Sequence, residues 1–96
     1  MNHNISKSIL YDRMYMIQQE VIKTDHTINH MMVLVEQCID ILLTPGHDFK
    51  CDGGAVGFLE DCSAMIAKLI ELFSYRIALL ESFFTCGDMY YAISRN

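Results

Sequence analysis

The stretch Leu10–Leu42, LYDRMYMIQQEVIKTDHTINHMMVLVEQCIDIL, decides the fold of this 96-residue chain. Apolar or small residues recur along it at alternating steps of four and three, and only one of them is clearly polar. The positions of this seam are Leu10, Met14, Ile17, Val21, Thr24, Ile28, Met31, Val35, Cys38 and Leu42. Such a long 4-3 alternation places one stripe along a single helix, and the stripe needs a partner helix.

The run from Lys23 to Thr27 is the weakest part of this predicted helix. Threonine and aspartate have poor helix propensity, and Thr24 or Asp25 could cap a new helix. The 4-3 phase passes through the run without a slip, which favours one continuous helix over about residues 5–43. A kink that divides it in two is the alternative. Beyond Met31 the apolar face widens, which predicts burial on more than one side.

Residues 44–54 interrupt the pattern. Pro45 disfavours a helical residue before it, and Gly53-Gly54 is typical of a corner. A second helix follows over about residues 55–85, with the main stripe Phe58, Cys62, Ile66, Leu69, Phe73, Ile77, Leu80 and Phe84. Gly87 predicts the end of this helix. We expect the tail, residues 88–96, to form a short turn that folds back.

The sequence therefore predicts an all-α fold: an antiparallel helical hairpin with long helices, in a single domain over residues 1–96. One hairpin has a single helix–helix interface, and 52% of the chain is apolar. That interface cannot bury both the widened face of the first helix and nearly all of the second. We therefore expect a homodimer that forms a four-helix bundle. A compact monomer with a broken first helix is the alternative.

The negative charge gathers around the middle of the chain. The net charge is −5, and the segment from Glu36 to Asp61 holds six acidic residues against Lys50 alone. Direct nucleic-acid binding is disfavoured, because it needs a basic stripe. We expect the acidic corner to contact a protein partner with a basic surface. The predicted contact residues are Asp40, Asp48, Asp52, Glu60 and Asp61.

Uncharged stretches reach only about ten residues, half of what a membrane-spanning helix needs, so we expect no membrane span. The first four residues do not resemble a secretory signal, and no two cysteines form a C-x-x-C pair. These features predict a cytoplasmic protein with reduced thiols and no cofactor.

Metal and catalytic signals are weak. His26 and His30 lie four residues apart and could share one ion, but two ligands do not make a closed zinc site. The set His47, Cys51 and Cys62 could supply three ligands, although its spacing matches no familiar zinc pattern. Asp48 begins a partial match to a calcium loop that lacks its bidentate glutamate. Cys51 near His47 is the only loop pair of a thiol and a base, without further support for catalysis. We expect no metal site and no enzymatic activity.

The leading hypothesis is a non-enzymatic protein–protein interaction module, an inhibitor or regulator that binds a basic partner through its acidic helix–loop–helix corner. One alternative is a small zinc-binding protein that uses the loop histidine and cysteines. Another is a chaperone-like helper that binds a client through its apolar seam. Tyr11, Tyr15 and Met16 could form a further partner contact, because aromatic residues and methionine are enriched at interfaces. Packing under the C-terminal tail is their alternative role.

Overall fold

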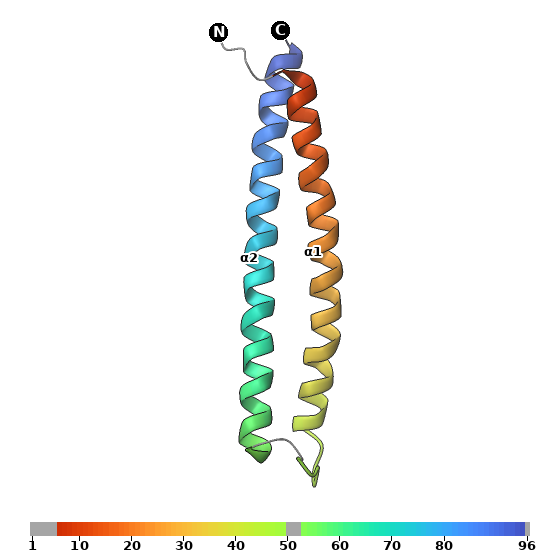
Figure 1. Cartoon of the computed structure of the whole chain (residues 1–96), viewed down its shortest axis with the longest axis vertical. Coiled ribbons are helices and arrows are strands. Elements are labelled where there is room, and N and C mark those ends of the chain that lie inside the picture. Colours follow the sequence, from red (N-terminus) through yellow and green to blue (C-terminus); the bar gives the residue numbers. More distant parts are fainter. Residues whose placement is uncertain (1–5, 50–52, 96) are drawn as a thin grey trace. The chain divides into compact units, whose positions relative to one another are not determined.

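The structure of the chain is a computed structural model that describes residues 6–49 and 53–95. These residues contain helix α1 (Lys7–Leu42), helix α2 (Gly54–Arg95) and no strand. They form two compact units, which we describe separately: unit 1 is residues 1–25 and 74–96, and unit 2 is residues 26–73. In each unit, a segment of α1 lies against a segment of α2 that runs the opposite way (Figure 1). The predicted all-α antiparallel hairpin is confirmed, while the single domain and the bundle of two copies stay predictions.

Helix α1 begins behind a serine cap and continues without a break. The backbone N–H of Ile9 donates a hydrogen bond to Oγ of Ser6 over 3.3 Å, as expected of an N-cap residue. The helix passes through residues 23–27 uninterrupted, so the predicted alternative of a division into two helices is wrong. Thr24 fits there because its hydroxyl donates a hydrogen bond to the carbonyl of Glu20 over 2.8 Å. This internal bond satisfies the one polar side chain of the seam.

The seam of α1 lies on its covered side. All ten of its positions are buried or half-buried, and the best covered are Leu10 and Thr24 in unit 1 and Ile28 in unit 2. Exposed residues flank the seam on both sides, which is the pattern of a helix with one apolar contact stripe.

The covered stripe of α2 differs from the predicted one. It follows a 4-3 alternation through Phe58, Cys62, Met65, Leu69, Leu72, Arg76, Leu79, Phe83, Cys86 and Tyr90, all buried or half-buried. Four residues predicted for the main stripe are exposed: Ile66, Phe73, Ile77 and Phe84. The two stripes share Phe58, Cys62 and Leu69, and the other covered positions up to Phe83 precede the predicted ones by one residue. These exposed residues form a second row of apolar side chains on α2, which faces solvent.

Helix α2 does not end near residue 85, and the separate folded-back tail was a wrong prediction. The helix continues through Gly87 to Arg95. A Cβ atom on Gly87 would lie 3.7 Å from the terminal methyl of Met14, so this glycine faces α1. One turn further, the ammonium of Lys7 lies 5.9 Å from the ring centre of Tyr90. These contacts with α1 extend the helix beyond a residue that often ends one.

The corner of unit 2 is built by turn residues and packed rings. Backbone N–H of Thr44 donates to the carbonyl of Ile41 over 3.1 Å, and Gly46 takes a positive φ of 74°. The rings of Phe49 and Phe58 lie 5.3 Å apart, so the loop packs against the start of α2. Gly53, with φ of 82°, precedes that start.

Candidate functional site

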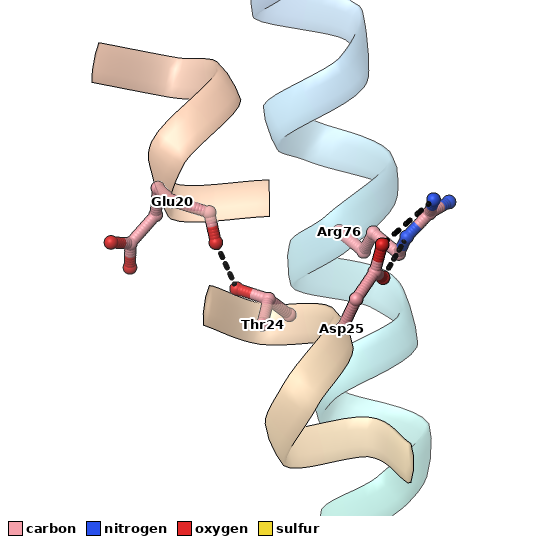
Figure 2. Close-up of polar contacts among 4 residues, drawn as sticks. All are labelled: Glu20, Thr24, Asp25 and Arg76. Carbon is pink, nitrogen blue, oxygen red and sulfur yellow. Dashed lines mark hydrogen bonds and ion pairs between the residues drawn. The ribbon is translucent and has the colours of Figure 1, made fainter. Parts of the chain in front are cut away.

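A polar contact crosses between the two helices of unit 1. Arg76 occupies a position in the covered stripe of α2, where its guanidinium reaches Asp25 of α1 (Figure 2). Nε donates to one carboxylate oxygen, and Nη2 donates to the other over 3.3 Å. The contact raises the pKa of Arg76 above its usual range, through the hydrogen bond to Asp25 and then through its negative charge. Two-point pairing fixes the orientation of both side chains.

A second polar contact joins the two helices at Tyr75, the residue before Arg76. The hydroxyl of Tyr75 donates a hydrogen bond to a carboxylate oxygen of Glu20 over 2.9 Å. The same carboxylate lies 3.7 Å from the ammonium of Lys23. The bond to Glu20 raises the pKa of Tyr75, because ionising the phenol would remove the donated proton beside a carboxylate. Both contacts fix the position of α1 along α2 within unit 1. Their role is therefore structural.

The largest set of exposed aromatic side chains in unit 1 gathers on one side of its helix pair. Two neighbouring grooves mark this side. One, of about 140 Å³, is lined by Tyr11, Met14, Tyr15, Gln18 and Phe83. The other, of about 200 Å³, is lined by Gln18, Val21, Leu80 and Phe83. Because both grooves share Gln18 and Phe83, they adjoin.

Helix geometry explains why aromatic side chains of both helices meet here. On α1, Tyr11 and Tyr15 each follow a seam residue by one position, and on α2 Phe84 follows the covered Phe83. In an antiparallel pair of helices, positions one after the contact stripe turn toward the same side. The rings of Phe83 and Phe84 lie edge to face, 5.9 Å between centres. We name this surface the aromatic face: Tyr11, Tyr15, Ile77, Leu80, Phe83, Phe84 and Tyr91.

The opposite side of unit 1 is more polar. Its grooves are lined by Ile9, Asp12, Arg13, Met16, Ile17, Glu20 and Leu79 in one case, and by Arg13, Ile17, Ala78, Leu79, Glu81, Ser82, Thr85, Cys86 and Met89 in the other. Met16 is exposed here, away from the groove that Tyr11 and Tyr15 line. The patch predicted from these three residues is therefore divided between the two sides.

The excess of acidic over basic residues lies in unit 2. Residues 26–73 contain seven acidic side chains and two lysines, whereas the rest of the chain contains five acidic and five basic ones. The whole net charge of −5 therefore falls in unit 2. Of the predicted contact residues, Asp40, Asp48, Glu60 and Asp61 are exposed, and none forms an ion pair with another described residue. Asp52 lies outside the described residues.

The predicted metal ligands are only partly placed. Among residues 6–49 and 53–95, no group of three His, Cys, Asp or Glu side chains could hold an ion. His26, His30 and His47 are exposed and Cys62 is buried. Cys51, like Lys50 and Asp52 of the partial calcium loop, lies outside the described residues. The zinc alternative therefore stays a prediction.

Comparison with known proteins places the chain in no family. No protein-family model, curated protein or solved structure matches it. Neither helix, over its described residues, has a segment both long and apolar enough to cross a membrane.

Proposed function

We propose that this chain is a non-enzymatic, cytoplasmic protein-interaction module, an inhibitor or regulator whose acidic corner binds a basic surface on another protein. The observation that carries the proposal is the division of charge: unit 2 holds all the net negative charge and unit 1 holds none. A charge confined to one part of a small protein creates a local potential that attracts a basic partner and orients its approach.

The exposure of the acidic side chains supports this role. Asp40 lies in the last turn of α1, Asp48 lies in the corner, and Glu60 and Asp61 lie near the start of α2. Carboxylates near the end of α1 meet the negative end of its dipole, an unfavourable place for Asp40 without a cation nearby. A partner that supplied lysine or arginine side chains would relieve this repulsion.

Contacts between aromatic rings restrict the corner that carries Asp48. His47 and Phe49 lie 4.8 Å apart between ring centres, and Phe49 packs in turn on Phe58 of α2. Asp48 stands between the two loop rings in sequence, so the packing restricts its backbone. A restricted contact residue loses less conformational entropy on binding than one in a free loop.

The test is affinity capture from native lysate with two charge-matched variants. One variant carries Asp48→Lys, Glu60→Lys and Asp61→Lys in unit 2, and the control carries Asp12→Lys, Glu81→Lys and Asp88→Lys in unit 1. Both change the net charge equally, and all six side chains are exposed. We expect the unit 2 variant to lose a basic partner that the wild type and the control retain. Equal capture by all three proteins would contradict the proposal.

A further inference from the structure

We propose that a second copy of this chain covers the aromatic face of unit 1, so that two copies associate through Phe84 and the adjoining grooves. This inference concerns unit 1 and does not rest on the proposed function, which concerns the acidic residues of unit 2. The size, shape and charge of the aromatic face favour this occupant.

The exposed apolar area of the face lies near the upper end of what soluble monomers leave uncovered. Tyr11, Phe84 and Tyr91 are each at least 60% exposed, and Tyr15 and Ile77 are exposed by more than half. At roughly 200 Å² for a whole aromatic side chain, the four aromatic residues among these five expose on the order of 500 Å². Soluble monomers rarely show larger contiguous apolar patches. A standard interface covers about 800 Å² per partner, so unit 1 supplies more than half of one.

The shape of the face offers both a projecting ring and a place to receive it. The grooves measure about 140 and 200 Å³. An enclosed cavity of about 150 Å³ holds benzene, so these open grooves have about the volume of one aromatic ring. Phe84 stands beside Phe83, which lines both grooves, and lies one helical turn after Leu80, which lines the second. In a two-fold interface each surface meets its own equivalent, so a ring beside a groove is self-complementary.

The distribution of charge favours unit 1 over unit 2 as the contact between two copies. The five acidic and five basic side chains of unit 1 leave it without net charge. Two such units approach each other without net repulsion, whereas two copies of unit 2 repel. A strongly basic or acidic partner gains no long-range attraction from the aromatic face. Between two copies, the charges therefore favour contact through unit 1 over contact through unit 2.

Sedimentation equilibrium of the purified full chain tests this pairing. The first variant is Phe84→Glu, which places a charge on the aromatic face. The control is Met16→Glu, which charges a side chain that is 70% exposed on the opposite side of the same unit. We expect twice the single-chain mass for the wild type and for Met16→Glu, and the single-chain mass for Phe84→Glu with unchanged helical circular dichroism.

If Phe84→Glu loses helix content, a milder variant at the same position still tests the pairing. Phe84→Ala adds no charge, and we expect it to raise the dissociation constant of the dimer at least tenfold, as loss of a central interface ring does. A wild type of single-chain mass at every concentration would overturn the inference and favour a client protein as the occupant of this face. A dimer that tolerates both Phe84 variants, or that Met16→Glu weakens equally, would also overturn it.

Discussion

Arg76 of α2 pairs with Asp25 of α1 through two hydrogen bonds, next to the buried Thr24. A charged residue thus occupies a position in the covered stripe of α2, where the neighbouring positions of the stripe are Leu72 and Leu79. Shifting one helix along the other would remove the guanidinium from its carboxylate. Among otherwise similar apolar contacts, the pair therefore specifies one register, a role that polar residues also have in coiled coils.

Exchanging the two charges tests this role. We expect Asp25→Arg and Arg76→Asp to lower the urea midpoint singly, because each places like charges together. The double variant should recover most of the loss, since it restores opposite charges at the same site. Denaturation of all four proteins in low salt measures the coupling. Additive losses in the double variant would show that the ion pair does not select the register.

The bond between Tyr75 and Glu20 predicts a dependence of stability on alkaline pH. The folded state raises the pKa of this phenol above its ordinary value of 10.0. The stabilising contribution is therefore complete below about pH 10 and is lost as the pH rises through the folded pKa. Tyr75→Phe lacks the hydroxyl, so the stability difference between wild type and variant should shrink over that range. Urea midpoints at successive pH values measure it, and a difference that stays constant would contradict the prediction.

Gly87 predicts a stabilising substitution. It lies inside α2, where a Cβ atom would meet only the methyl of Met14 at an ordinary contact distance of 3.7 Å. Gly87→Ala should raise the free energy of unfolding by about 0.5–1 kcal/mol, because alanine loses less backbone entropy in a helix.

Gly53 is the matched control. Its φ is positive, and a Cβ atom there would lie 3.2 Å from Cα of Gly57. Gly53→Ala should therefore lower the free energy of unfolding by about 1–3 kcal/mol. Thermal or urea unfolding compares the two variants. Destabilisation by Gly87→Ala would show that α2 is interrupted near its C-terminal end.

The covered seam of α1 predicts that truncating Ile28 lowers the free energy of unfolding more than truncating Met16. Ile28 is 4% exposed and Met16 is 70% exposed. Ile28→Ala should lower the free energy of unfolding by about 2–5 kcal/mol, since it removes buried methyl groups and leaves a cavity. Met16→Ala should change it by less than about 0.5 kcal/mol. Equal costs would place the contact stripe of α1 elsewhere.

The sequence was sufficient for the covered stripe of α1 and insufficient for that of α2. Between Ile17 and Met31 polar residues separate the seam positions of α1, so the phase of its 4-3 series is clear. Helix α2 is apolar around most of its circumference, and its periodicity fits two neighbouring stripes. The covered one includes Arg76, which looks like a surface residue until its partner on the other helix is known. Partners distant in the sequence leave no periodic signal.

The end of α2 and the aromatic face could not be predicted from the sequence, because both depend on contacts between the two helices. Glycine after a helical run commonly marks a stop, and only the contacts of Gly87 and Tyr90 with α1 explain why the helix continues. Tyr11 and Tyr15 suggested an interface from sequence, but Phe84 joined them only through antiparallel pairing. The concentration of acidic residues, in contrast, was readable from the sequence directly.

The most direct test of the proposed function measures the affinity of the captured basic partner for the purified chain by calorimetry. The wild type and the unit 1 control, with Asp12, Glu81 and Asp88 changed to lysine, should bind alike and more weakly as salt increases. The unit 2 variant, with Asp48, Glu60 and Asp61 changed to lysine, should bind at least tenfold more weakly. Equal affinities for the two variants, or affinity independent of salt, would contradict recognition through the acidic corner.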